Sequence, residues 1–152
     1  DEYTRYINER FQDSHLKIDT DESIYLQTIL NRIPESINML CFELNVTLKN
    51  KRILKADIHK ALTSILEKRA ARFSAVIFQF SSAQKEILKL LAWEGFMLHP
   101  QSKQYLLKLN LTARSVSQNI QYLFNNGFVG LQEKGYYILD PFLRMYLIRS
   151  QK

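Results

Sequence analysis

Four polar side chains recur at helical spacing in the segment that begins at Ala113. They are Arg114, Gln118, Gln121 and Asn125. On an α-helix, spacings of four, three and four residues place them on one stripe. A guanidinium group pairs with phosphate, and a carboxamide can donate to and accept from a base edge. The stripe is therefore a predicted nucleic-acid-binding face.

The opposite side of the same segment is apolar. Its members are Val116, Ile120, Leu123 and Phe124, which recur with the helical period and are predicted to face a core. Thr112 precedes the segment as a predicted N-cap, and Asn126-Gly127 is predicted to end it.

A second helix is predicted to begin after Ser81, because Ser81 followed by Gln84 forms a capping-box pattern. Its predicted inward residues are Ile87, Leu88, Leu91 and Ala92. Gly95 is predicted to end this helix, and the flanking Trp93 and Phe96 are predicted to be core residues. A short helix is predicted over about residues 102–109.

Two β-rich runs, 128–131 and 136–139, flank the turn-forming sequence Gln132-Glu133-Lys134-Gly135 and predict a hairpin. Asp140-Pro141 then predicts the start of a last helix. Three helices, a two-stranded wing and a closing helix are typical of a winged helix-turn-helix, with the segment from Ala113 as its recognition helix. Ser115 and Lys134 complete the predicted nucleic-acid contacts.

The first 75 residues predict four further helices with short connections, the third of which begins at Pro34. The expected fold class is therefore mainly α: a four-helix bundle over 1–75, followed by a winged helix-turn-helix over 76–152. The spacing of apolar residues over 73–80 is ambiguous. It fits either an extended segment or a continuation of the fourth helix.

The net charge of +6 is unevenly distributed. Residues 1–47 carry 4 basic and 9 acidic side chains, whereas residues 48–75 carry 8 and 2. A basic run is therefore either an auxiliary phosphate patch or an ordinary solvated surface. The run contains Lys49, Lys51, Arg52 and Lys55, with Lys68, Arg69 and Arg72 further along.

Several kinds of function are not expected. The sequence has no apolar run long enough to cross a membrane and no signal peptide. His15, His59 and His99 lie far apart, so no metal site is expected. The single cysteine, Cys41, lies in an apolar run and is expected to be buried in a reducing compartment, which favours a cytoplasmic protein.

The phrases Ser82–Ala92 and Tyr137–Tyr146 resemble the winged helix that ends archaeal-type AAA+ ATPases, a family also common in Bacteroidetes-like bacteria and related to signal-transducing and origin-recognition-type ATPases. The four-helix part is similar to the lid of those enzymes. The resemblance places Arg32-Ile33-Pro34 where relatives carry Gly-x-Pro near bound nucleotide. Arg32 and Pro34 are thus either close to nucleotide or only the start of a helix.

The resemblance also implies an ATPase core before residue 1, which would bind ATP and Mg²⁺. The sequence contains no Gly-x-x-x-x-Gly-Lys-Ser/Thr phosphate-binding loop. No catalysis and no cofactor are therefore expected of this part alone. The chain also starts without Met, and we expect it to be part of a longer protein.

Three hypotheses remain. The first is that the winged helix docks on duplex DNA. Alternatively, it contacts a protein, either the ATPase core or another partner, in which case Tyr122 at the rim of the polar face would be an anchor. The third hypothesis is a stand-alone transcription regulator whose first 75 residues form a dimerisation or sensor domain.

Overall fold

The chain divides into two compact units, Asp1–Arg69 and Ala70–Lys152, and the computed structural model describes residues 2–151. The division falls inside one long helix, α4 (Lys55–Phe78). The boundary that the sequence predicts, between residues 75 and 76, lies in the same helix. Residues 73–78 continue α4, which resolves the ambiguous period of this segment in favour of a helix.

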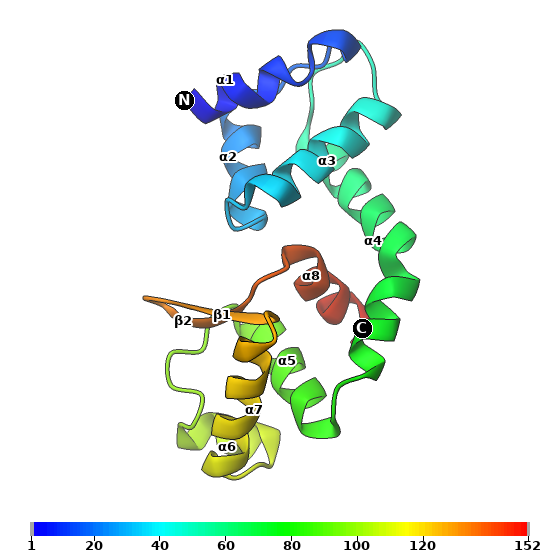
Figure 1. Cartoon of the computed structure of the whole chain (residues 1–152). Helices are drawn as coiled ribbons and strands as arrows, with labels where there is room; N and C mark the ends of the chain where they lie inside the picture. Colours follow the sequence, from blue (N-terminus) through cyan, green and yellow to red (C-terminus); the bar gives the residue numbers. More distant parts are fainter. Residues whose placement is uncertain (1, 152) are drawn as a thin grey trace. The chain divides into compact units, whose positions relative to one another are not determined.

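The first unit contains α1 (Glu2–Glu9), the 3₁₀ helix η1 (Gln12–Ser14), α2 (Thr20–Ile29), α3 (Pro34–Thr47) and the first part of α4 (Figure 1). α1 ends at Glu9, and the chain then turns through η1. His15 then adopts a left-handed conformation, with φ of 52°.

Apolar side chains from all four α-helices form the core of the first unit. They include Ile7, Leu26, Leu30, Ile37, Leu40, Leu44 and Ile58, each 0% exposed. Cys41 is 1% exposed, which confirms that it is buried. A polar link also joins α1 to α2, because Thr4 Oγ1 donates to Ser23 Oγ at 2.9 Å and Gln27 Nε2 donates to the same oxygen at 2.9 Å.

The second unit contains α5 (Ser82–Glu94), α6 (Lys103–Leu109), α7 (Ala113–Asn125), β1 (Val129–Gln132), β2 (Gly135–Ile138) and α8 (Pro141–Ser150). This order confirms the predicted mainly helical fold with a two-stranded wing (Figure 1). α5 is the central element, since it contacts α6, α7, α8 and β2.

The helix starts of the second unit have the predicted caps. Ser81 Oγ accepts from the Gln84 amide at 3.2 Å, and Gln84 Oε1 accepts from the Ser81 amide at 3.0 Å. Asp140 Oδ1 accepts from the Phe142 amide at 2.9 Å at the start of α8. Gly95 ends α5 with φ of 81°, a conformation that favours glycine.

The wing is an antiparallel pair in which Val129 lies opposite Ile138 and Gln132 lies opposite Gly135. Both strands are therefore shifted by one residue from the predicted runs, and the turn is shorter. Met97 adds a further bridge, because it exchanges two backbone hydrogen bonds of 3.0 Å with Tyr136. The wing is thus held to the segment after α5.

Candidate nucleic-acid interface

The recognition helix α7 is fixed to α5 by one apolar side and one carboxamide bridge. Val116, Ile120 and Leu123 are buried. Gln84 Nε2 of α5 donates to Asn119 Oδ1 at 3.1 Å. Thr112 Oγ1 accepts from the Ser115 amide at 3.1 Å and confirms the predicted N-cap. These contacts set which side of α7 faces solvent.

The four residues of the predicted stripe are all exposed. They are Arg114, Gln118, Gln121 and Asn125. Because 3.6 residues make one turn, they fall on one side of α7. Gln121 Nε2 donates to Asn125 Oδ1 at 2.9 Å, so part of the amide row is already ordered. The structure therefore brings these four side chains together on one surface, which we call the α7 stripe.

Ser115 lies outside the α7 stripe. It is half-buried, and its Oγ accepts from Asn119 Nδ2 at 3.3 Å. Since Asn119 is also bonded to α5, Ser115 belongs to the side of α7 that supports the helix. Its contribution to a ligand stays a prediction.

Aromatic side chains adjoin the α7 stripe. Tyr122 is 47% exposed. Phe124 is 43% exposed, so the prediction that it lies in the core with Leu123 is wrong in large part. The apolar side of α7 is narrower than the sequence period indicates, because α5 covers only the Val116, Ile120 and Leu123 side.

Lys134 lies in the turn of the wing rather than on α7. Its Nζ stands 5.7 Å from the centroid of the Phe96 ring, within the range of a cation–π contact. Phe96 in turn stands 5.5 Å from Tyr137 of β2, centroid to centroid. Lys134 is exposed but its head group already has an aromatic partner.

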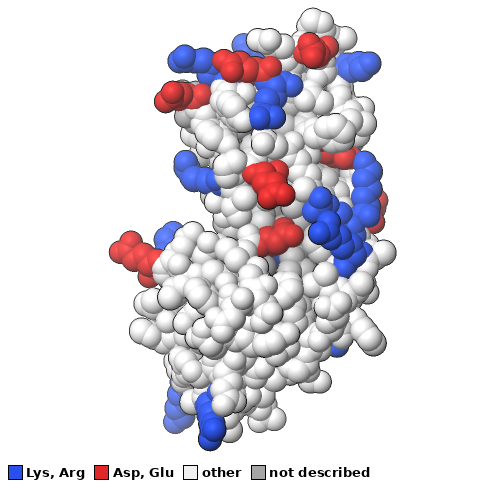
Figure 2. Space-filling view, in the orientation of Figure 1, with Lys and Arg blue, Asp and Glu red and all other residues white. Residues whose placement is uncertain are grey.

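The surface of the second unit carries few charges. No Asp or Glu occurs in residues 95–132, where the only cations are Lys103, Lys108 and Arg114. Lys108 Nζ lies 3.4 Å from Glu94 Oε1. Figure 2 shows this part of the chain as mostly uncharged on the face in view. A phosphate backbone would meet little repulsion here, but also only modest attraction.

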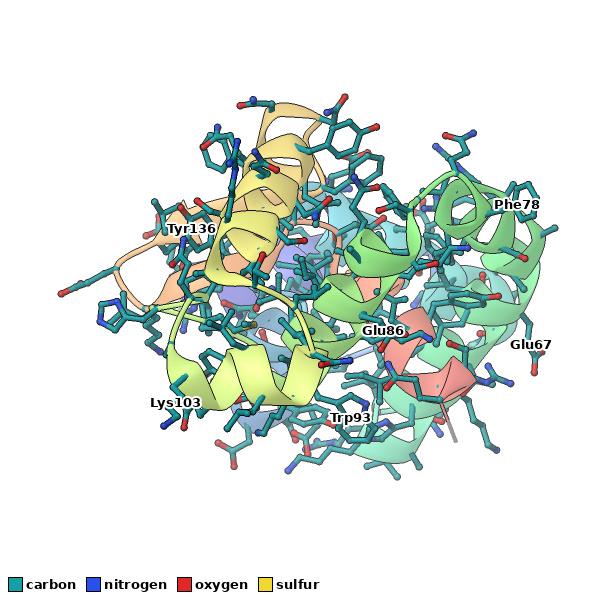
Figure 3. The ribbon with its side chains drawn as sticks, turned by 90° about the horizontal axis from the view of Figure 1, so that it is seen from below. Glu67, Phe78, Glu86, Trp93, Lys103 and Tyr136 are labelled. Carbon is teal, nitrogen blue, oxygen red and sulfur yellow. The ribbon has the colours of Figure 1, made fainter. Side chains whose placement is uncertain are left out.

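Trp93 is not a core residue, contrary to the sequence prediction. It is 53% exposed, and Figure 3 shows it at the edge of the second unit. Its indole Nε1 donates to Gln151 Oε1 at 2.7 Å, so the polar end of the ring contacts the residue after α8. The inward face of α5 is filled by smaller aliphatic side chains.

Sequence reasoning missed the role of Arg144 in holding this module together. Its Nε donates to the carbonyl oxygen of Ala92 at 2.8 Å, and burial lowers the pKa of its guanidinium. A cation near the last carbonyls of a helix is stabilising. Asp140-Pro141 indicated α8 but gave no signal for this contact, which spans 52 residues.

In the first unit, Arg32 and Pro34 lie in the turn between α2 and α3. Arg32 has φ of 55° and its amide donates to the Gln27 carbonyl at 2.8 Å. Pro34 occupies the first turn of α3 and lines an open cleft of about 530 Å³ with Glu2, Tyr3 and Tyr6. Arg32 is exposed and does not line this cleft.

The predicted basic patch is partly neutralised by acidic side chains. Lys51 Nζ lies 2.8 Å from Asp57 Oδ2, and Arg52 pairs with Asp19. Burial alone would raise the pKa of Asp57, but the hydrogen bonds from Lys51 and the Leu54 amide hold it below its ordinary value.

Two further cations of that patch have different surroundings. Lys55 Nζ lies 5.1 Å from the Tyr25 ring centroid. Lys49 is exposed beyond the end of α3. The four predicted residues therefore do not form a continuous surface of unpaired cations.

Within residues 2–151, no group of three or more His, Cys, Asp and Glu side chains is arranged to hold a metal ion. Burial raises the pKa of the Cys41 thiol to about 12, so it stays protonated and unreactive near neutral pH. None of the described helices is both long and apolar enough to span a bilayer.

The helix order, the capped α7 and the antiparallel wing define a winged helix-turn-helix. The family described as a probable winged helix domain matches residues 71–149, and the chain belongs to this family. No curated protein and no solved structure gives a significant match.

Proposed function

We propose that the winged helix docks on duplex DNA through the α7 stripe, as the C-terminal region of a larger AAA+ ATPase. The docking proposal depends on one observation. Four exposed hydrogen-bonding residues form a row on α7, a capped helix whose other side is buried. In this class of fold, that helix enters the major groove.

The chemistry of the stripe suits a modest and largely sequence-tolerant contact. Arg114 supplies a phosphate or guanine contact, while Gln118 and Gln121 offer donors and acceptors to base edges. The absence of acids from residues 95–132 leaves no like-charge barrier to phosphate. With so few cations, the affinity for DNA should be weak. Its dependence on salt should also be shallow, because binding would release only a few counterions.

Fluorescence anisotropy with a labelled random duplex tests the docking proposal. We expect a Kd on the order of 10⁻⁵ M at low salt, weakening as salt rises. The double substitution Arg114→Ala and Lys134→Ala should weaken binding and reduce the salt slope by about 1 for each lost phosphate contact. Lys89→Ala is the single-charge control, because Lys89 lies on α5 and pairs there with Glu86.

An unchanged affinity and slope in the double variant would refute the assignment of the stripe and wing. A loss in Lys89→Ala of about half that in the double variant would show that only the total charge matters, because the double variant removes two charges and the control removes one. Neither result would bear on the fold.

The AAA+ parentage is supported by the resemblance of Ser82–Ala92 and Tyr137–Tyr146 and by the backbone at Arg32. The left-handed conformation of Arg32 is one that glycine adopts most easily. It therefore fits a position where the resembling proteins carry Gly-x-Pro. ATP and Mg²⁺ chemistry would belong to residues outside this sequence, and this part would have no enzymatic activity of its own.

The parentage is tested by isolating the native protein and mapping its peptides by mass spectrometry. A native chain whose peptides include a phosphate-binding loop upstream of Asp1 would support it. A native chain that lacks this loop would refute the parentage and favour the stand-alone regulator.

A second function has a specific observation in its favour. Tyr122 and Phe124 are both exposed beside the α7 stripe, and α7 carries a single cation. Aromatic side chains anchor protein interfaces more often than they anchor duplex DNA. The alternative is therefore that α7 contacts the ATPase core or another protein. The absence of duplex binding at low salt would put this function ahead.

A further inference from the structure

The helix α3 is apolar on two sides. Its inward side carries Ile37, Leu40 and Leu44, all 0% exposed. Its outward side carries Phe42 and Val46, which are 69% and 61% exposed. Large apolar side chains that are exposed together on one side of a helix mark a candidate contact surface. Within the described residues of the first unit, no element covers the outward side of α3.

The outward residues form a regular stripe. Met39, Phe42 and Val46 are separated by three and four residues, so they lie in a row along α3. Met39 is half-buried at one end of the row. We call these three residues the α3 stripe. It spans about two helical turns and contains no charge.

The two ends of α3 carry opposite charges. Glu35 stands in its first turn, one turn before Met39 and on the same side. Lys49 follows Leu48, the residue that caps the C-terminal end. Among the described residues, neither Glu35 nor Lys49 has a salt-bridge partner, whereas Lys51, Arg52 and Lys68 all do.

We propose that the α3 stripe binds a second copy of this chain, with the two α3 helices antiparallel across a two-fold axis. The axis passes near Phe42, which lies almost midway along the charged span. Met39 of each copy then meets Val46 of the other, and Glu35 of each copy meets Lys49 of the other.

A second copy fits better than an unrelated helix because the surface is complementary to itself. A two-fold axis pairs every residue with its mirror position along the helix. When a second copy lies antiparallel, the apolar centres of the two helices meet, and the negative end of each helix lies beside the positive end of the other. Two parallel copies would instead place Glu35 beside Glu35 and Lys49 beside Lys49.

The expected dimer is weak. Stable interfaces bury about 1,600 Å² in total, and a stripe of three side chains per copy supplies only part of that area. Association should therefore appear only at high protein concentration, with a Kd on the order of 10⁻⁴ M. Salt should weaken it, because the Glu35–Lys49 pairs would be exposed at the rim.

Sedimentation velocity of the chain from about 10 µM to about 1 mM, around the expected Kd, is the test. The weight-average mass should rise from that of one chain, 18.0 kDa, toward twice this value. Phe42→Asp should abolish the rise. Phe78→Asp is the matched control, because Phe78 is an 82% exposed phenylalanine at the end of α4 (Figure 3).

A charge swap tests the antiparallel arrangement separately. Glu35→Lys should raise the dissociation constant severalfold, and adding Lys49→Glu should restore it, since each pair is again of opposite sign. Circular dichroism of every variant checks that the helices remain.

Three outcomes would overturn the proposal. They are a mass that stays at one chain throughout, an equal loss in Phe42→Asp and Phe78→Asp, and a double swap that fails to restore what Glu35→Lys loses. If the mass stays at that of one chain, the α3 stripe would instead be expected to bind a different protein segment.

Discussion

The two units of this chain are stabilised by different kinds of contact. All the buried polar or charged residues within 2–151 belong to the first unit: Thr4, Ser14, Ser23, Gln27, Ser36 and Glu43. Its ion pairs join residues far apart in sequence, such as Arg52 with Asp19 and Lys68 with Glu43. The core of the second unit is apolar around α5.

This difference separates stability from binding. The first unit pairs several of its charges internally, so Lys51, Arg52 and Lys68 are less available to a ligand. In the second unit the half-buried Arg144 bonds a backbone carbonyl rather than an acid, and the exposed polar row on α7 is free to contact a partner. It follows that ionisation should govern the stability of the first unit and have little influence on that of the second.

The largest expected effect comes from the apolar centre of the second unit. Leu91 of α5 is 0% exposed and packs among the helices of this unit. Leu91→Ala should reduce the free energy of unfolding of the second unit by about 2–5 kcal/mol through lost contacts and a residual cavity. Thermal and urea unfolding followed by circular dichroism will measure it.

Substitution of Leu107, which is 73% exposed on α6, provides the control. Leu107→Ala should change the unfolding free energy by less than about 0.5 kcal/mol. Similar losses from both changes would contradict a core centred on α5.

The wing offers the next largest effect. A Cβ at Gly135 would lie 2.5 Å from the backbone carbon of Met97, and φ there is 122°. Gly135→Ala should therefore break the Met97–Tyr136 bridge and destabilise the second unit by about 2–3 kcal/mol. Amide hydrogen exchange at Met97 and Tyr136 will report the opening.

Gly127 is the matched glycine, with φ of 77° and no atom within 4 Å of an added Cβ. Gly127→Ala should show only conformational strain, about 1 kcal/mol. A larger loss at Gly127 than at Gly135 would show that the bridge contributes little.

Acid should act on the first unit through Glu43. The hydroxyl of Ser64 donates to Glu43 Oε1 at 2.5 Å, and with Lys68 Nζ it holds the pKa of this carboxyl below its ordinary value against the effect of burial. A lowered pKa stabilises the fold fully above the unfolded value, about 4.3, and the contribution is lost as pH falls through the folded value.

Glu43→Gln should therefore destabilise the first unit by about 1–2 kcal/mol at neutral pH and make its stability less dependent on pH below about 4.3. Urea titrations at several acidic pH values will measure this. Glu9→Gln is the control, because Glu9 is an exposed residue at the end of α1. An unchanged acid dependence in Glu43→Gln would contradict the role of this carboxylate.

The smallest of these effects concerns a local signal in the second unit. Asp140→Ala removes the oxygen that accepts from the Phe142 amide and should destabilise α8 by about 1 kcal/mol. Asp140→Asn retains an acceptor and should lose less. If both variants lose equally, the charge rather than the hydrogen bond is responsible.

Local sequence signals were sufficient to predict the elements that depend on contacts within a few residues. Ser81 with Gln84, Thr112 and Asp140-Pro141 fixed the starts of α5, α7 and α8, because a side-chain cap bonds an amide only two or three residues away. The spacing of the α7 stripe likewise follows from the helical period alone.

Which surfaces are exposed and which charges are paired depends on tertiary contacts that the sequence pattern does not show. Trp93 and Phe124 have the pattern of core residues, but neighbouring elements do not cover them. Arg52 forms an ion pair with Asp19, which lies 33 residues away in the sequence. Such contacts depend on how distant segments meet, and no local pattern in the sequence encodes that meeting.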